Sequence, residues 1–181
     1  MLRAGIIGFG YMGHFHYDKM LAFPERIQAV AVYDIAETAR AEAVEKGMWA
    51  YEDLEAFLNE DLDLVIIATP NQWHAGYTIA AMRSGKHVVL EKPAVMNVKE
   101  MEDIIACEKE TGRLFTVHHQ RRHDMDFQIV SQIVKSGEIG NVTTIESRVM
   151  GERGVCFGWR ADPEYGGGML YDWGVHLIDQ L

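Results

Sequence analysis

The first 117 residues alternate between short apolar runs and longer stretches in which apolar positions recur with a helical period. Apolar runs of this length predict strands, at residues 3–7, 27–33, 64–68, 87–90 and 114–117, with a further short one at 48–51. The stretches between them predict helices at residues 12–21, 36–46, 54–59, 72–84 and 98–109. This alternation is typical of a parallel sheet covered on both faces. We therefore predict an α/β fold, a Rossmann-type doubly wound parallel sheet.

Residues that stop or start helices support these boundaries. Gly47, Gly85 and Gly112 each stand where a left-handed residue would end a helix, and glycine adopts that conformation readily. Asn97 precedes the last of the five helices, and an asparagine side chain there can accept a hydrogen bond from the first helical turn.

The pattern changes near residue 120, where residues 118–124 form a polar run with neither helical nor strand period. Beyond it we predict a helix at 127–135, a turn at 137–141, a period-two strand at 142–150 and a helix at 169–181. We therefore divide the chain into a nucleotide-binding domain, residues 1–119, and the incomplete start of an α+β substrate and oligomerisation domain, residues 120–181. One strand cannot bury a sheet of its own, so we interpret the chain as a fragment of a longer protein.

A glycine motif joins the first predicted strand to the first predicted helix. Its sequence, G-x-G-x-x-G, is Gly8-Phe9-Gly10-Tyr11-Met12-Gly13. In this context the glycines allow a tight turn, a close approach to a pyrophosphate and close packing of the helix. The N–H groups at the start of the helix then face the anion.

An acidic residue supports the same interpretation. Asp34 ends the second predicted strand, 21 residues after Gly13, at the distance where a carboxylate binds a ribose diol. We predict a dinucleotide site; the alternative is a glycine-rich turn without a ligand.

Unusual polar residues follow two further strands, and in a doubly wound sheet this edge binds the ligand. One group is Thr69-Pro70-Asn71 with His74, and the other is Glu91-Lys92-Pro93. Lys92 stands out because Pro93 restricts its backbone to extended conformations. A lysine so held at a cofactor cleft can polarise a substrate oxygen, although a solvated lysine at a strand end remains the simpler alternative.

A second group of candidate residues follows three glycines, at 166–168. Three glycines ahead of a helix allow close backbone approach to a ligand or to another strand. Asp172 and His176 are separated by four residues and share a helix face. The carboxylate can orient the imidazole and favour its charged form, but this spacing is also common in surface pairs.

Composition and charge exclude several classes of function. The chain is 48% hydrophobic with a net charge of −10 and has no long basic run, so nucleic acid is not an expected partner. Neither a signal peptide nor an apolar membrane span is evident. The two cysteines, Cys107 and Cys156, show no motif spacing. We interpret them as free thiols of a cytoplasmic protein.

Several histidines invite other interpretations. His118 and His119 are adjacent, so they point to opposite faces of a strand end, and with His123 they lack a further ligand at metal-binding spacing. We predict no metal site. His14 and His16, in the opening helix, are interpreted as packing residues.

Taken together, these motifs resemble those of the Gfo/Idh/MocA oxidoreductases, over the whole chain. The resemblance covers the glycine motif with His16, Thr69-Pro70-Asn71 with His74, Glu91-Lys92-Pro93, Gln120-Arg121-Arg122, and Trp159-Arg160 with Gly167-Gly168, Asp172, Gly174, His176 and Asp179. Two positions depart from the family pattern. Gln120 replaces the commoner asparagine, and Trp173 stands where smaller residues are frequent.

The resemblance implies hydride transfer between a nicotinamide cofactor and a secondary alcohol of a sugar or cyclic polyol. His176 would be the general base, Lys92 would stabilise the developing alkoxide, and Asp172 would position the substrate. The cofactor would contact Gly8, Phe9, Gly10, Tyr11, Met12, Gly13, Asp34, Thr69, Pro70, Asn71, His74, Glu91 and Lys92. Arg122, Trp159 and Arg160 would bind the substrate.

Further expectations concern the cofactor and the behaviour of this chain. Asp34 favours NAD over NADP, and Arg40 is the residue that could rescue NADP. We expect a homo-oligomer, and we expect this chain alone to bind the nucleotide without catalysing turnover. Two alternatives stay open: a non-catalytic nucleotide-sensing module and an NAD-dependent glycosidase.

Overall fold

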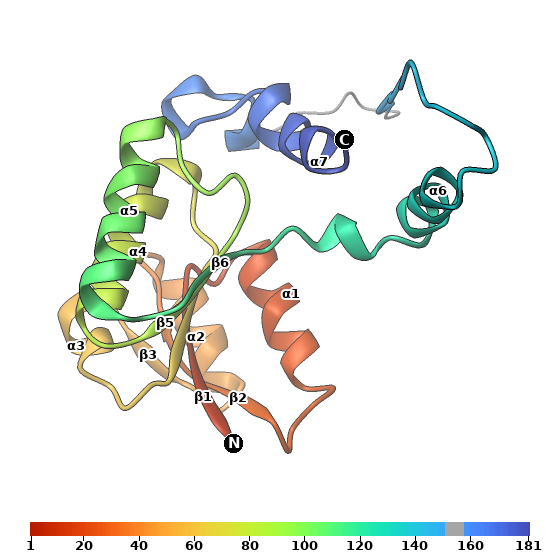
Figure 1. Cartoon of the computed structure of the whole chain (residues 1–181). Coiled ribbons are helices and arrows are strands. Elements are labelled where there is room, and N and C mark those ends of the chain that lie inside the picture. Colours follow the sequence, from red (N-terminus) through yellow and green to blue (C-terminus); the bar gives the residue numbers. More distant parts are fainter. Residues whose placement is uncertain (151–157) are drawn as a thin grey trace. The chain divides into compact units, whose positions relative to one another are not determined.

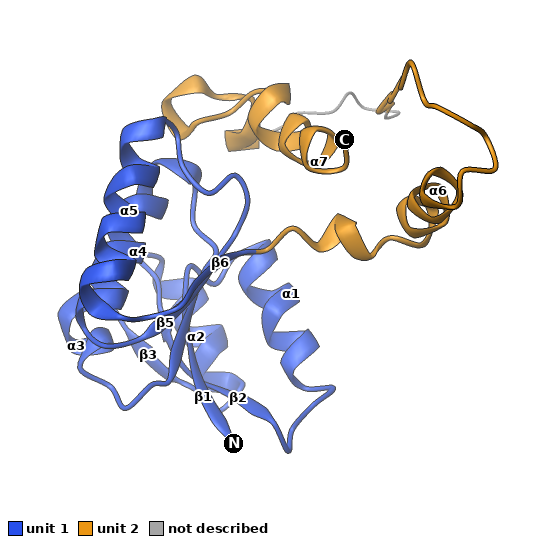
Figure 2. Cartoon of the chain, in the orientation of Figure 1, with its two compact units in different colours: residues 1–117 blue, residues 118–181 orange. Residues whose placement is uncertain are grey.

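A computed structural model describes residues 1–150 and 158–181 and divides the chain into two compact units, residues 1–117 and 118–181 (Figure 2). The first unit holds a six-stranded sheet in the order β3-β2-β1-β4-β5-β6. Its strands, all paired in parallel, are β1 (Leu2–Ile7), β2 (Ile27–Tyr33), β3 (Trp49–Tyr51), β4 (Leu64–Ile67), β5 (His87–Leu90) and β6 (Phe115–Val117). This strand order is that of a doubly wound sheet, so the predicted fold class is confirmed.

Helices connect the strands of the first unit (Figure 1). They are α1 (Tyr11–Met20), α2 (Glu37–Glu45), α3 (Leu54–Leu58), the 3₁₀ turn η1 (Asn71–Trp73), α4 (His74–Arg83) and α5 (Val98–Thr111). Each lies within a few residues of its predicted range. The fourth predicted helix begins with the 3₁₀ turn instead of a regular α-helical turn.

Alternating side chains of the strands pack into two separate hydrophobic clusters. In β1, Ile6 packs in a cluster with Met20 of α1 and Ala43 of α2. Its neighbour Ile7 packs in the other cluster, with side chains from α3, α4 and α5 that include Met82. Successive residues of a strand point to opposite faces, so the two clusters cover both faces of the sheet.

The predicted helix ends are confirmed. Gly47, Gly85 and Gly112 have φ angles of +81°, +87° and +64°, in the left-handed region that glycine tolerates. Asn97 caps α5, because its Oδ1 accepts a hydrogen bond from the N–H of Glu100 at 3.0 Å.

The second unit is built from helical segments. They are the 3₁₀ turn η2 (Gln120–His123), α6 (Met125–Ser136), the 3₁₀ turns η3 (Gly158–Ala161) and η4 (Pro163–Tyr165), the π-helical segment η5 (Leu170–Gly174) and α7 (Val175–Asp179). The helix predicted at 127–135 is confirmed as α6, which ends before Gly137 at a φ of +77°. The helix predicted at 169–181 is confirmed in its position, but it opens as a π-helix.

The strand predicted at 142–150 is wrong, because these residues have no regular secondary structure. A strand requires a neighbour whose backbone groups complete its hydrogen bonds. No other strand occurs among the described residues of the second unit, so the period-two sequence has no partner to pair with there.

The described helices include none with the length and hydropathy that a membrane crossing requires.

Candidate functional site

The glycine loop is shaped by two close backbone approaches. Gly8 has a φ of +88°, and a Cβ there would lie 2.9 Å from the carbonyl oxygen of Ala68, directly after β4. A Cβ on Gly13 would lie 2.3 Å from the carbonyl oxygen of Gly8. Since β1 and β4 flank the point where the sheet order reverses, these approaches lie at the place where sheets of this kind bind ligands.

The third glycine faces open space. A Cβ on Gly10 would have no heavy atom within 4 Å. The first hydrogen bond of α1 runs from the His14 N–H to the Gly10 carbonyl at 2.9 Å, so the N–H groups of Tyr11, Met12 and Gly13 precede the helical ladder. Free N–H groups beside an open backbone fit an anion such as a pyrophosphate.

Asp34 is fixed at the end of β2 by two backbone donors. Its Oδ2 accepts a hydrogen bond from the Phe9 N–H at 2.7 Å, and its Oδ1 accepts one from the Ala36 N–H at 2.8 Å. The carboxylate therefore ties the glycine loop to the next strand. The Phe9 side chain is only 1% exposed and packs in the core, so a cofactor contact by Phe9 stays a prediction that would involve its backbone.

Arg40 is held by the loop that follows Asp34. Its Nη1 donates to the carbonyl oxygens of Asp34 and Ile35, each at 2.9 Å, and its Nη2 donates to Glu52 at 3.2 Å. The guanidinium thus stabilises the turn, and reaching a 2′-phosphate would require it to give up these partners.

The segment after β4 brings Thr69, Pro70 and Asn71 to the same edge of the sheet. Asn71 is buried at the start of η1. Thr69 Oγ1 is buried and has no hydrogen-bond partner among the described residues. A buried hydroxyl of this kind is costly unless a further group satisfies it, which fits a site built to hold a polar ligand.

His74 is wholly buried and lies between two loops of this edge. Its Nδ1 is 2.8 Å from the carbonyl oxygen of Pro93, and its Nε2 is 2.9 Å from that of Thr69. Burial lowers the pKa of His74, while the two carbonyls oppose that shift. The predicted contact of His74 with the cofactor stays a prediction; the ring itself bridges the loops after β4 and β5.

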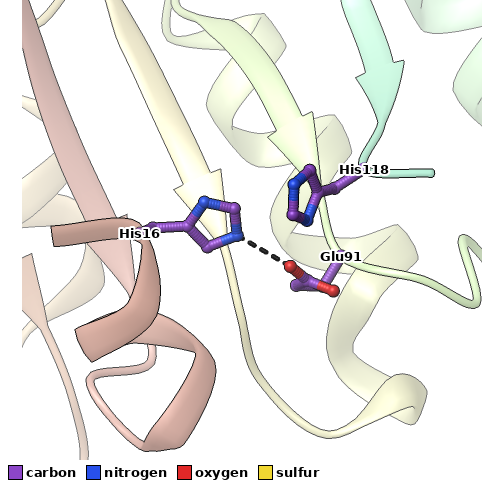
Figure 3. Close-up of side chains that lie close together, drawn as sticks. All are labelled: His16, Glu91 and His118. Atoms are coloured by element: carbon purple, nitrogen blue, oxygen red, sulfur yellow. Dashed lines mark hydrogen bonds and ion pairs between the residues drawn. The ribbon is translucent and has the colours of Figure 1, made fainter. Parts of the chain in front are cut away.

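Glu91 and Lys92 directly follow β5. The Glu91 N–H donates to the carbonyl oxygen of Ile67 at 2.9 Å and so extends the pairing of β5 with β4. Its carboxylate is buried, with Oε1 2.7 Å from Nε2 of His16 on α1 (Figure 3). The Lys92 N–H donates to Glu91 Oε2 at 3.2 Å, and the Lys92–Pro93 peptide is cis.

In the second unit, Arg122 forms a two-pronged ion pair with Asp179 of α7. Its Nε donates to Oδ2 at 2.7 Å, and its Nη2 donates to Oδ1. The hydrogen bond from Arg122 lowers the pKa of Asp179, and Nδ1 of His119 lies 3.3 Å from the same carboxylate. This pairing joins η2 to α7.

The predicted substrate residues Trp159 and Arg160 stack, with the guanidinium carbon 4.4 Å from the ring centroid. Arg160 Nε also lies 3.6 Å from Asp172 Oδ1. A Cβ on Gly167 would lie 2.5 Å from the Arg160 carbonyl oxygen. Gly167 thus makes a close backbone approach, but to the 3₁₀ turn η3 that carries Arg160 and not to a strand, and a Cβ on Gly168 would meet no heavy atom within 4 Å.

His176 is only 3% exposed. Its ring centroid lies 6.1 Å from that of Trp173 and 6.3 Å from that of His119. Trp173 in turn lies under the guanidinium of Arg121, at 4.4 Å. The imidazole is therefore set in an aromatic surrounding, beside the carboxylate of Asp179, whose pKa it helps to lower.

Two residues contact candidate site residues, although the sequence analysis gave them no role in the site. His16 was interpreted as a packing residue, and Asp179 was part of the resemblance without a role. The only available signal was their position in motifs, because their partners Glu91 and Arg122 lie 75 and 57 residues away. Cys107 is a free, buried thiol whose pKa is raised by burial; Cys156 lies outside the described residues.

Two sequence profiles match the chain. The profile of the oxidoreductase family with an NAD-binding Rossmann fold, GFO_IDH_MocA, covers residues 2–119, and that of the GFO/IDH/MocA C-terminal domain covers residues 127–181. The chain belongs to the GFO/IDH/MocA family. The resemblance noted in the sequence is thereby confirmed, and the first unit is a Rossmann domain of the NAD-binding type.

Members of the GFO/IDH/MocA family with assigned names are similar along most of the chain. The scyllo-inositol 2-dehydrogenase (NADP(+)) IolW of Bacillus subtilis (strain 168) is 32% identical over 99% of this chain and 50% of its own length. Inositol 2-dehydrogenase of Salmonella typhimurium (strain LT2) is 30% identical over 81% of this chain and 45% of its own length.

A solved structure of an NAD-binding protein from Listeria innocua is also similar, with a TM-score of 0.93 and 39% identity. It covers 99% of this chain and 53% of its own. The chain spans about half the length of the curated relatives it matches.

The glycine geometry makes a first prediction. Replacing Gly13 with alanine places a Cβ against the backbone of Gly8, which cannot move aside, and should lower the free energy of unfolding by about 1–3 kcal/mol. Gly10→Ala meets no such atom, so it should leave stability nearly unchanged but weaken nucleotide binding by about tenfold or more. Urea denaturation and titration of NADH fluorescence measure the two effects. Equal destabilisation by both substitutions would contradict this interpretation of the loop.

The burial of His74 leads to a prediction of how the stability of the fold depends on pH. Because burial lowers its pKa in the folded state, the unfolded chain binds the proton more readily. Stability should therefore fall as the pH drops below the ordinary value of 6.5, by at most about 1.4 kcal/mol per pH unit. His74→Gln cannot titrate and should remove this part of the loss. Urea midpoints of both proteins at about pH 7.5 and about pH 5.5 provide the comparison, and parallel losses would exclude His74 as the source.

Proposed function

We propose that the full-length protein oxidises a secondary alcohol of a sugar or cyclic polyol with a nicotinamide cofactor. The observation that carries the proposal is the placement of Lys92 directly after β5, with its backbone held by Glu91, at the edge that the glycine loop and Asp34 also occupy. Curated relatives named as inositol dehydrogenases support the choice of substrate class.

The residues of the first unit fit a dinucleotide. The open backbone at Gly10 and the first N–H groups of α1 would hold the pyrophosphate, and Asp34 would accept hydrogen bonds from the ribose diol. Thr69 Oγ1, which lacks a partner among the described residues, would complete its hydrogen bonding on the ligand. The nicotinamide, when bound, supplies the hydride acceptor.

Three side chains would carry the proton chemistry. Lys92 would donate a hydrogen bond to the substrate hydroxyl oxygen and stabilise it as its proton leaves. His176 would take that proton, a role suited to an imidazole, whose ordinary pKa lies near neutral pH. Asp172, beside Arg160, would position the substrate.

We further propose that residues 1–119 bind the cofactor and residues 120–181 begin the substrate domain. In the latter, Trp159 and Arg160 would contact the polyol. Arg122 is engaged by Asp179, so its contribution would be to fix α7, which carries His176, as much as to bind the substrate directly. Cytoplasmic location and a homo-oligomeric state stay predictions.

Substitution of the proton-handling residues tests the proposal. In the full-length protein, Lys92→Met and His176→Ala should each lower turnover by at least about 100-fold, as is typical for the loss of an acid–base group. The affinity for NADH should stay within a few-fold, because the nucleotide is held mainly by the glycine loop and Asp34. Steady-state nucleotide reduction across a panel of sugars and inositols, together with NADH fluorescence, measures both quantities.

Lys99→Met is the matched control, since Lys99 pairs with Asp103 on the surface of α5 and should not affect turnover. A Lys92 or His176 variant that keeps most of its turnover would remove that residue from the mechanism. A wild-type protein that reduces neither nucleotide with any member of the panel would contradict the proposed function.

The choice of cofactor is tested separately. We expect NAD to bind more tightly than NADP, because a 2′-phosphate would face the Asp34 carboxylate. Like charges 4 Å apart repel by about 1 kcal/mol in water and about 4 kcal/mol at an effective dielectric of 20. Titration of both nucleotides should show about 10-fold to about 1,000-fold preference for NAD, and Asp34→Asn should reduce it. Equal affinities in the wild-type protein would overturn the expectation. The name of the Bacillus relative specifies NADP(+), so this outcome is worth testing.

A further inference from the structure

Two polar side chains that take no part in the proposed proton chemistry, His16 and Glu91, are buried against each other in the first unit. His16 is 8% exposed and Glu91 is 4% exposed, and the ring nitrogen Nε2 lies 2.7 Å from the carboxylate oxygen Oε1. The same helix carries a second pair of the same kind, His14 with Glu42 at 2.9 Å, whose side chains are 33% and 55% exposed. Only the buried pair lies beside a candidate catalytic group.

Burial makes the His16–Glu91 pair costly to form. A carboxylate taken out of water loses its hydration, and the attraction of one partner repays this only with good geometry and further hydrogen bonds. Replacing such a pair with apolar side chains is often neutral or stabilising. General stability is therefore a weak reason for a histidine and a glutamate at these positions, and the groups that they touch are a better guide to their role.

The second carboxylate oxygen of Glu91 connects the pair to the backbone of Lys92. Oε2 accepts a hydrogen bond from the N–H of Lys92 at 3.2 Å, so the carboxylate bridges the imidazole of His16 and the backbone of the lysine. On the far side of Lys92, the carbonyl oxygen of Pro93 lies 2.8 Å from His74 Nδ1. The backbone on both sides of Lys92 is thus fixed by buried polar side chains.

The other end of the bridge is the nucleotide-binding helix. His16 lies on α1, one helical turn after Gly13, and Figure 3 shows its ring facing the Glu91 carboxylate directly beyond β5. Because α1 begins at the glycine loop, the pair connects the segment that would bind the pyrophosphate to the segment that carries Lys92.

We propose that His16 is a positioning residue for Lys92 and acts through Glu91. The role rests on the proposed function, because Lys92 is catalytic only if the protein transfers hydride. Glu91 was expected to contact the cofactor; in this proposal its carboxylate instead sets the position of the lysine relative to α1. A catalytic amine must be held within about half an ångström of its productive geometry, and this bridge supplies part of that restraint.

Chemical labelling of Lys92 tests the restraint without any need for turnover. The full-length protein and its His16→Leu, His16→Gln and Glu91→Gln variants are treated with pyridoxal 5′-phosphate and borohydride, and peptide mass spectrometry follows each lysine. Loss of the bridge should free the half-buried Lys92 and raise its labelling rate by about fivefold or more, the factor that corresponds to the loss of one net hydrogen bond. Lys99, exposed on α5, is the internal reference.

His16→Gln separates positioning from packing. Its amide N–H can still donate to Glu91, so this variant should label close to the wild-type rate, whereas His16→Leu should not. His14→Leu, at the exposed pair on the same helix, should leave Lys92 labelling unchanged. The double variant His16→Leu/Glu91→Gln should show no further increase over either single variant, because both remove one shared interaction.

Kinetics of an active wild-type enzyme give a second measure. His16→Leu and Glu91→Gln should lower kcat by about tenfold or more, because a displaced catalytic group slows the reaction, with the KM for NAD and the affinity for NADH within about threefold. Unchanged Lys92 labelling in folded His16→Leu and Glu91→Gln variants, or a fall in activity that simply follows thermal stability, would overturn the proposal.

If His16→Leu does not fold, Glu91→Gln and His16→Gln still decide it. If the wild-type protein oxidises no polyol, the proposed function fails while the labelling result still decides whether the bridge restrains Lys92.

Discussion

The close approach of three backbone segments around Gly8 is the constraint on which the first unit depends. The chain turns there at a φ of +88°, against the end of β4 on one side and against Gly13 of α1 on the other. A side chain at Gly8 or Gly13 would overlap with main-chain atoms, which cannot rotate away. Because the segments meet so closely, the start of α1 and the ends of β1 and β4 converge on one small region, where the backbone would form the proposed pyrophosphate site.

Buried polar side chains then fix the loops around that region. Asp34 holds the glycine loop to the end of β2, His74 lies between the loops after β4 and β5, and Glu91 connects α1 to Lys92. Each uses a side chain to satisfy backbone groups that no strand or helix would satisfy. Loops are usually more mobile than the strands and helices that they connect. Loops restrained in this way can hold side chains in fixed positions at the carboxyl ends of the strands, as a catalytic site would require.

The sequence predicted the fold well wherever the signal was local. The apolar runs gave the strands of the sheet, and single residues such as Gly112 and Asn97 marked helix ends that the structure confirms. The strand at 142–150 failed because pairing depends on a neighbour that the pattern does not contain. Likewise, no local pattern could reveal that His16 faces Glu91, since burial and long-range contacts decide it.

The edges of the sheet have a consequence for how this chain meets other chains. Both edge strands, β3 and β6, are only three residues long, shorter than the four strands between them. An approaching strand from another molecule would find very few unpaired backbone groups to bond with. Short edges of this kind are one way in which sheet proteins avoid fibre-like growth, so this sheet offers little template for strand addition at either side.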